Sequence, residues 1–294
     1  MILPGLHVLT NALIAGILLG GLFAATAVGL SLVFGVMRMI NLMHGELLVL
    51  GAYLALELRR VAHLDPLLSI LVVAPVLFVF GLPVFRFLLE PVMRRGPEPA
   101  LLTTFGLSII GQSAFIALFS GDTQTLTASY SSSSWSIGGF HVPVMYVVSF
   151  LIGAAVCGAL DLLIRRTGLG REIRAGSEDA PAAAALGVNV RRTHLLVFGI
   201  AAACAGVGGV LVGATFDFTP TSGMSYLLSG FVVVVLGGLG SVRGTLVGAI
   251  VLGVVESLGG AAFGDGYRDF VGFVVFLVVM SMRPQGLFGR RQLA

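Results

Sequence analysis

Long apolar segments separated by short polar interruptions dominate the chain, and their lengths predict membrane-spanning helices. A spanning helix needs about 20 predominantly apolar residues, because the hydrocarbon core of a bilayer is about 30 Å thick. Residues 9–58 are almost continuously apolar, but about 50 helical residues measure roughly 75 Å, so this stretch must turn or break. The later expected spans are residues 65–88, 100–120, 143–164, 193–215, 226–242, 244–262 and 268–282.

The break in residues 9–58 is expected at MRMINLMHGE, residues 37–46, where polar side chains interrupt the apolar run. Backbone groups freed in a broken membrane helix are tolerated only where they are buried in protein or line a wet cavity. Asn41, His44 and Glu46 can then bind a small polar solute, with Gly45 between them. The alternative is a turn in which these side chains only satisfy nearby backbone groups.

A second break is expected at LGGLGSVRG, residues 236–244, which includes Gly237, Gly238, Gly240 and Ser241. The segment has neither the spacing nor the context of a phosphate-binding loop. Its glycines suit a tight turn or a close backbone approach, either in a transport pathway or in a plain hairpin between two spans. Residues 29–53 and 231–253 share the order apolar run, polar break, apolar run, which hints at an internal repeat.

Glu256 lies in the middle of the apolar segment 244–262. A charge at that depth costs roughly 2.5–3.5 kcal/mol or more, so this side chain must face protein or water, or be protonated. It is either a functional residue of a pathway or a buried glutamate that bonds to a neighbouring helix.

The longest polar interruption, residues 165–192, contains six arginines. A short helix is expected in its middle, capped by Ser177 or Asp179, and Gly187 suits a left-handed C-terminal cap. The alanines at positions 182–185 give this helix a smooth surface. The segment is either a solvated connection or a docking element for another protein.

Composition supports an integral membrane protein, with 57% hydrophobic and 11% charged residues against roughly 25% charged in soluble domains. All 17 basic residues are arginine. Without lysine the chain has no P-loop, so any ATP that drives it is hydrolysed by another chain. No nucleophile elbow, H-E-x-x-H motif or paired Cys and His ligand pattern is present, which argues against catalysis and a bound metal.

The arginines also predict the orientation. With the N-terminus outside and nine crossings, fourteen of the 17 arginines fall on or near the cytoplasmic side, including all six of residues 165–192. The positive-inside rule favours this arrangement, with a cytoplasmic C-terminus. The Ser-rich segment 121–142 is then an external, solvated loop with Trp135 near the interface. Glycine pairs such as Gly16 and Gly20, Gly206 with Gly209 and Gly213, and Gly244 with Gly248 predict close helix packing.

Four motifs in order give the chain a family resemblance over nearly its whole length. They are GLSLVFGVMRMINLMHGELLVLGAY at 29–53, the loop ending in AAAALGVNVRR, FVVVVLGGLGSVRGTLVGAIVLGVVES at 231–257 and RPQGLFG at 283–289. With them, the chain resembles the permeases of branched-chain amino acid ABC importers. The resemblance implies a heterodimer with a sister permease, one cytoplasmic ATPase docked on each, and a separate extracytoplasmic substrate-binding protein. It implies no cofactor on this chain, and ATP used by the partner subunits.

The resemblance also implies that the cytoplasmic coupling segment is Ala175 to Val190, with Gly187 as its glycine. In more distant importers a glutamate stands six residues before that glycine, and here Pro181 occupies the position. The acidic residue that follows His-Gly in the family's break motif is Glu46. The implied ATPase-coupling residues are Arg174, Glu178, Asp179, Ala183, Ala184 and Gly187.

Together these observations predict one all-α transmembrane permease domain, residues 1–294, with eight to nine transmembrane helices, broken or re-entrant segments and a cytoplasmic coupling helix. The expected function is the non-enzymatic permease subunit of an ABC importer in the bacterial cytoplasmic membrane, moving branched-chain or related small amino acids inward. The alternatives are a permease for urea or short amides of the same class, an ion-coupled carrier using Glu46 or Glu256, and an assembly scaffold with no pathway. The candidate pathway residues are Asn41, His44, Gly45, Glu46, Gly237, Gly238, Gly240, Ser241 and Glu256.

Overall fold

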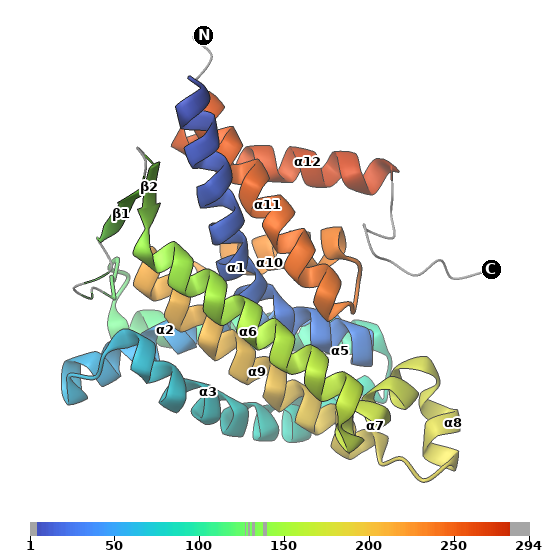
Figure 1. Ribbon diagram of the computed structural model, residues 1–294. Coiled ribbons are helices and arrows are strands. Elements are labelled where there is room, and N and C mark those ends of the chain that lie inside the picture. The colour runs from blue at the N-terminus through green and yellow to red at the C-terminus, as the bar shows by residue number, and fades with distance from the viewer. Residues whose placement is uncertain (1–4, 127, 129, 131–132, 138–139, 283–294) are drawn as a thin grey trace.

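Helices form nearly all of the described structure, and one short hairpin of two strands joins them (Figure 1). The computed structural model describes residues 5–126, 128, 130, 133–137 and 140–282. The RPQGLFG motif at 283–289 lies outside the described residues. The α-helices are α1 Leu6–Met37, α2 His44–Ala62, α3 Pro66–Pro83, α4 Glu90–Met93, α5 Pro97–Phe119, α6 Val144–Arg166, α7 Gly168–Glu178, α8 Ala180–Ala185, α9 Val190–Thr215, α10 Gly223–Gly237, α11 Val242–Phe263 and α12 Arg268–Met282.

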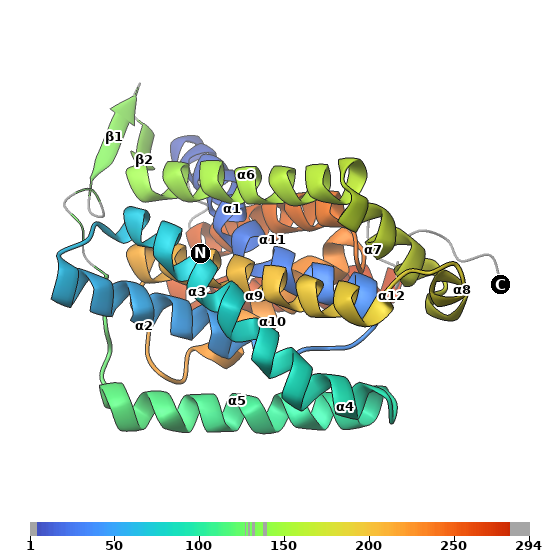
Figure 2. The same cartoon turned by 90° about the horizontal axis from the view of Figure 1, so that it is seen from below.

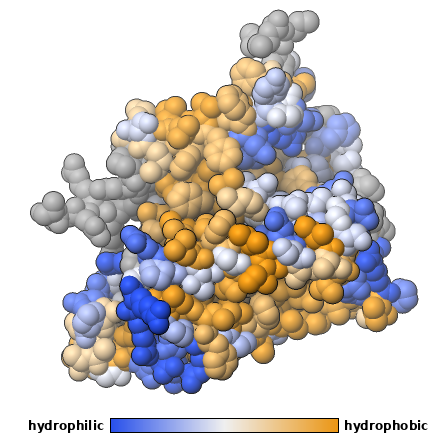
Figure 3. Space-filling view, turned by 180° about the vertical axis from the view of Figure 1, so that it is seen from behind, coloured by the Kyte–Doolittle hydropathy of each residue, from blue (hydrophilic) through white to orange (hydrophobic). Residues whose placement is uncertain are grey.

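The helix ends fall close to the expected ones, and both expected breaks are present. The π-helical turn Val84–Leu89 joins α3 to α4, and the 3₁₀ turn Asp265–Tyr267 precedes α12. Six helical segments are long and apolar enough to cross a membrane: Leu6–Met37, Pro66–Met93, Glu98–Phe119, Val144–Arg166, Val190–Thr215 and Val242–Phe263. Figure 3 shows apolar residues over much of one face, as a lipid-facing surface requires.

Three of the expected crossings are shorter or more polar than a full spanning helix. They are α2, α10 and α12, of which α10 has 15 residues. At a rise of 1.5 Å per residue, α10 measures about 22 Å, less than the hydrocarbon core of about 30 Å.

Glycine allows α1 to contact α11 along its backbone. A Cβ added at Gly20 would lie 2.5 Å from the Cα of Ile250, and one at Gly253 would lie 2.3 Å from the carbonyl oxygen of Gly16. On another face of α1, Gly21 and Gly153 of α6 approach in the same way. Packing is the main force between helices in lipid, where the hydrophobic effect does not act between them. The expected interface at Gly16 and Gly20 is therefore confirmed as a contact within the chain.

The helix α9 is packed in the same manner on α2. A Cβ at Gly209 would lie 1.9 Å from the carbonyl oxygen of Leu48, and one at Gly51 would lie 2.8 Å from that of Gly206. Along α1, Thr26 faces Gly208 of α9 and Gly29 faces Ala201. The residue numbers rise in one helix as they fall in the other, so α1 and α9 are antiparallel.

The first break returns the chain along α1 before α2 begins. His44 bonds to the carbonyl oxygen of Thr26, and from Thr26 to Met37 α1 advances about 16 Å. Residues 38–43 cover that distance without regular helix. Consequently α2 begins beside the middle of α1, inside the bundle.

The segment 121–142 was expected to be a solvated loop, and this is only partly right. Gln124 forms a β-bridge with Phe218, and Leu126 is fully buried. The strands β1 Ser134–Ile137 and β2 Phe140–Pro143 then pair as an antiparallel hairpin on which Trp135 is exposed. The apolar Leu126, which the Ser- and Thr-rich composition concealed, fixes the start of the segment on the bundle.

The contact between α1 and α11 leads to a test of the packing. We expect Gly253→Ala to lower the free energy of unfolding by about 1–3 kcal/mol, because its methyl group must push two backbones apart. The matched control is Gly158→Ala on α6, where an added Cβ meets nothing within 4 Å. Thermal unfolding in detergent compares the two variants. A midpoint for Gly253→Ala equal to or above that of Gly158→Ala would contradict the packing described here.

Candidate functional site

The polar residues of the first break organise the start of α2. Asn41 is 1% exposed, and its Oδ1 accepts a hydrogen bond from the Met43 amide at 3.2 Å. Its carbonyl oxygen accepts a bond from the His44 amide at 3.2 Å. Asn41 thus ties the extended segment to the first turn of the helix, which is a local structural role.

His44 and Glu46 each use one polar atom for the fold and leave one without a partner. The Nε2 atom of His44 lies 2.8 Å from the carbonyl oxygen of Thr26 and donates to it, and Ser108 Oγ of α5 donates to Glu46 Oε1 at 3.1 Å. His44 Nδ1 and Glu46 Oε2 are buried with no hydrogen-bond partner among the described residues. Buried polar atoms are seldom left unpaired, so each marks a position where a further group can bind.

The first turns of α2 and α10 meet at Glu46. A Cβ added at Gly45 would lie 2.1 Å from the carbonyl oxygen of Gly223, and one at Gly223 would lie 2.7 Å from Glu46 Oε1. The N-terminal end of a helix carries partial positive charge, which favours a carboxylate beside it. Glu46 is 4% exposed and lies between α2, α5 and α10. A carboxylate, a hydroxyl and two helix N-termini thus meet at the junction of these three helices.

The second break lies at the other end of α10. Gly238 and Gly240 have φ of +93° and +79°, and an added Cβ at Gly240 would lie 2.6 Å from the Cα of Gly35. Ser241 caps α11 by accepting a bond from the Gly244 amide at 3.1 Å. Both the tight turn and the close approach expected from its glycines are present. The length of α10 separates Glu46 from this turn by about 20 Å, so the two breaks do not form one pocket.

Glu256 belongs to a third place. Its side chain packs on α12, where an added Cβ at Gly272 would lie 3.1 Å from Oε1. Along α11 it stands about 21 Å from the turn at Ser241. The structure therefore places Glu256 in a contact between α11 and α12, apart from the second break.

The Arg-rich segment forms two helices, of which the sequence indicated one. In α8, Asp179 Oδ1 accepts a bond from the Ala182 amide at 2.9 Å. Gly187 has φ of +89°, and the Val188 amide bonds to the Ala183 carbonyl oxygen at 3.0 Å, which closes the helix in the expected way. The preceding helix α7 was not anticipated. Its signals were the cap residue Thr167 and the three-residue spacing of its buried positions, Gly170, Ile173 and Gly176.

Of the six expected coupling residues, all but Ala183 are exposed. Ala183 is buried against the protein, whereas Ala184 is exposed and Leu186 is 87% exposed. Arg174 donates to the carbonyl oxygen of Ile164, so it binds its own chain. Figures 1 and 2 agree that α7 and α8 project from one end of the bundle.

A pocket of about 350 Å³ lies where this segment meets the first break. Arg38, Glu178, Asp179 and His194 contribute its polar lining, and Val36 and Met37 part of its apolar lining.

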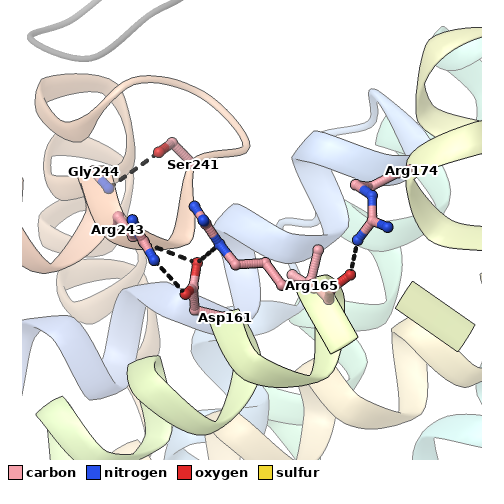
Figure 4. Close-up of polar contacts among 7 residues, drawn as sticks. Asp161, Arg165, Arg174, Ser241, Arg243 and Gly244 are labelled. Atoms are coloured by element: carbon pink, nitrogen blue, oxygen red, sulfur yellow. Dashed lines mark hydrogen bonds and ion pairs between the residues drawn. The ribbon is translucent and has the colours of Figure 1, made fainter. Parts of the chain in front are cut away.

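An ion-pair cluster joins α6 to α11 (Figure 4). It was not predicted from the sequence. Arg243 Nε and Nη2 donate to Asp161 Oδ1 and Oδ2 at 3.1 and 3.0 Å, and Arg165 Nε donates to Oδ1 at 2.9 Å. The four-residue spacing of Asp161 and Arg165 indicates that these two side chains pair on one face of a helix. Asp161 and Arg243 are 82 positions apart, and no sequence feature indicated that they pair.

Comparison with known proteins places this architecture in a family. The model of the branched-chain amino acid transport system permease component matches residues 12–280. The chain belongs to this family. The permease is 32% identical to the high-affinity branched-chain amino acid transport system permease protein BraD of Pseudomonas aeruginosa, over 98% of each chain. It is 30% identical to LivH of Escherichia coli over 94% of each chain.

One further permease protein and one solved structure also match the chain. A second permease protein of the same kind of system, LivM of Escherichia coli, is 34% identical over 50% of this permease and 34% of LivM. Among solved structures, PsaBC from Streptococcus pneumoniae in complex with Fab matches with a TM-score of 0.50 and 16% identity, over 96% and 94% of the two chains. At that identity the structural match shows the fold alone. The permease is thus a helical membrane transport component, as its sequence motifs predicted.

The cap of α8 gives a test of this segment in the permease. We expect Asp179→Ala to destabilise α8 by about 0.5–2 kcal/mol, because the Ala182 amide loses its acceptor. Hydrogen exchange of the backbone amides of residues 182–188 measures the effect. The control is Asp179→Asn, whose side chain retains an acceptor for the cap. Equal exchange in the two variants would show that the cap does not hold the helix.

Proposed function

We propose that this permease is one transmembrane subunit of an ABC importer that moves branched-chain or related small amino acids inward across the bacterial cytoplasmic membrane. The observation that carries the proposal is the family match over residues 12–280, with BraD and LivH matching over nearly the whole chain. The partial match to LivM supports a sister permease of related sequence as the second half of a heterodimer. Two ATPase subunits and an extracytoplasmic binding protein complete the proposed assembly.

The proposed orientation places α7 and α8 in the cytoplasm and the start of α1 outside. Its support is the arginine distribution, which puts the six arginines of residues 165–192 and Arg38 and Arg243 on one side. The extended segments 38–43 and 216–222 then complete the crossings that the short helices α2 and α10 make only in part. Such discontinuous helices are common at the binding sites of transporters.

The proposed docking element for an ATPase is α8 with its C-terminal turn. The exposed Pro181, Ala184 and Leu186 form its contact surface. Asp179 caps the start of the helix, Gly187 ends it, and the buried Ala183 packs against the rest of the protein. Small residues allow a groove to approach the backbone, and Leu186 offers one large apolar side chain to fill it. The chain has no lysine for a P-loop, which supports ATP hydrolysis by the partner.

The proposed transport pathway passes the junction of α2, α5 and α10. Two observations support this: Glu46 Oε2 is buried there without a partner among the described residues, and two helices begin at the same point. A carboxylate in a low-dielectric region attracts a cationic group strongly, and amino acids carry an ammonium group. In this view the second break and its glycines act as a hinge at the far end of α10.

Reconstitution tests the proposed function. We expect proteoliposomes that contain this permease, its sister permease and both ATPases to take up radiolabelled leucine when ATP and the binding protein are supplied. Isolated permease is expected to hydrolyse no ATP and to drive no uptake. Uptake by the isolated chain in response to a proton or sodium gradient would instead favour an ion-coupled carrier.

A pair of matched substitutions tests the pathway. We expect Glu46→Gln to lower leucine uptake by the complex about tenfold, since a bond to a charged group contributes about 1.5–3 kcal/mol and glutamine cannot supply the charge. Glu256→Gln makes the same chemical change in the contact between α11 and α12, and is expected to leave uptake nearly unchanged. A larger loss with Glu256→Gln than with Glu46→Gln would move the pathway away from the α2, α5 and α10 junction.

A further inference from the structure

We propose that Asp161 and Arg243 are positioning residues that link the α7–α8 segment to the glycine turn between α10 and α11. The inference rests on the proposed function, because it concerns how a movement at the docking element reaches the membrane helices. It concerns residues that lie outside the pathway and outside the docking surface. Three features of the structure carry it: the geometry of the ion pair, the attachment of α7 to α6, and the position of Arg243 beside the glycine turn.

The ion pair has the two-pronged geometry that fixes relative orientation. Two nitrogens of Arg243 bond to the two oxygens of Asp161, and the Asp161 side chain is 23% exposed (Figure 4). A planar guanidinium that binds a carboxylate through two parallel bonds restrains rotation as well as distance. Arg165 adds one bond from the same helix. Among the described residues, Arg243 alone therefore connects another helix to α6 through this carboxylate.

On the loop side, α7 is fastened to the last turns of α6. Arg174 of α7 donates to the Ile164 carbonyl oxygen, one turn beyond Asp161. Thr167 caps α7 through the Gly170 amide at 3.0 Å, and a Cβ at Gly170 would lie 2.2 Å from the Ile164 oxygen. Little room is left between the two helices. A displacement of α7 must consequently displace the end of α6 that carries Asp161.

On the membrane side, Arg243 is the second residue of α11 and follows the turn that contains Gly238 and Gly240. Both glycines have positive φ, where other residues are strained, and the turn contacts Gly35 near the end of α1. A hinge needs a few positions that absorb changes in φ and ψ. Arg243 holds the end of α11 next to such positions, so a pull on its side chain acts on the turn.

A second bond ties the same segment to the other break. Arg38 Nη2 donates to the carbonyl oxygen of Ser177 in α7 at 3.2 Å, and Arg38 is the first residue after α1. The second break contacts α1 at Gly35, three residues before Arg38. The α7 helix is thus joined to one break directly and to the other through Asp161.

The exposure of the ion pair separates this role from a purely stabilising one. The Arg243 side chain is 65% exposed, and ion pairs with such exposed partners contribute little to stability. Loss of the pair should leave folding and assembly nearly unchanged. Its effect should appear in the ratio of substrate transported to ATP hydrolysed.

The experiment measures that ratio in the complete complex in proteoliposomes, with ATP, binding protein and radiolabelled leucine. We expect Asp161→Asn and Arg243→Gln each to lower leucine uptake about tenfold while ATP hydrolysis falls less than about twofold, because a charged bidentate contact is lost between two moving parts. Arg165→Gln is the matched control, since it removes a positively charged partner of the same Asp161 carboxylate but leaves the bonds between α6 and α11 intact. Its transport ratio should stay close to that of the unaltered complex.

If a single variant fails to assemble, the charge-reversed double variant Asp161→Arg with Arg243→Asp tests whether the ion pair between these positions sets the transport ratio. Recovery of the transport ratio in the double variant supports the link, and its absence overturns it. The proposal is also overturned if uptake and hydrolysis fall in proportion, or if Arg165→Gln lowers the ratio as much as Arg243→Gln. Failure of the unaltered complex to transport leucine with ATP would reject the proposed function instead, and is seen before any variant is compared.

Discussion

Direct contact between helix backbones is the interaction on which the rest of this permease depends. In lipid the apolar side chains gain little by leaving their surroundings, so helices associate where their backbones can approach. Glycine provides this along α1 and α11, and along α2 and α9, with separations that leave no space for a methyl group. These close contacts form a frame around α1. Within that frame the shorter helices α2 and α10 can begin inside the bundle.

The frame permits a polar junction that an isolated membrane helix could not carry. A helix that begins at membrane depth has amides without partners in its first turn, and lipid cannot bond to them. Here α2 and α10 begin at the same point, beside the Glu46 carboxylate, and α5 adds the Ser108 hydroxyl. Burial of a glutamate and exposure of helix N-termini would each cost free energy alone. Together they offset one another, and Glu46 Oε2 remains without a partner among the described residues.

Much of the fold could be predicted from the sequence, because helix ends, caps and breaks are local. The break at Asn41 to Glu46, the caps at Asp179 and Gly187 and the glycine turn after Gly237 all follow from residue types at short spacing. What could not be predicted depends on contacts between distant segments. The placement of Glu46 and Glu256 in different contacts, the inward face of Ala183 and the pairing of Asp161 with Arg243 each need the fold. The partly buried start of segment 121–142 was missed for the same reason.

The arrangement of α10 suggests how the two breaks act together. One end of α10 meets Gly45 and Glu46, and the other end leads into the turn that Arg243 follows. Between them, a Cβ at Gly230 would lie 3.8 Å from Ala27 of α1, an ordinary contact distance. An uninterrupted helix transmits displacement along its axis. Under the proposed link, a shift of α7 that moves the glycine turn would therefore reach the Glu46 junction through α10, with no contact needed between that junction and the α7–α8 segment.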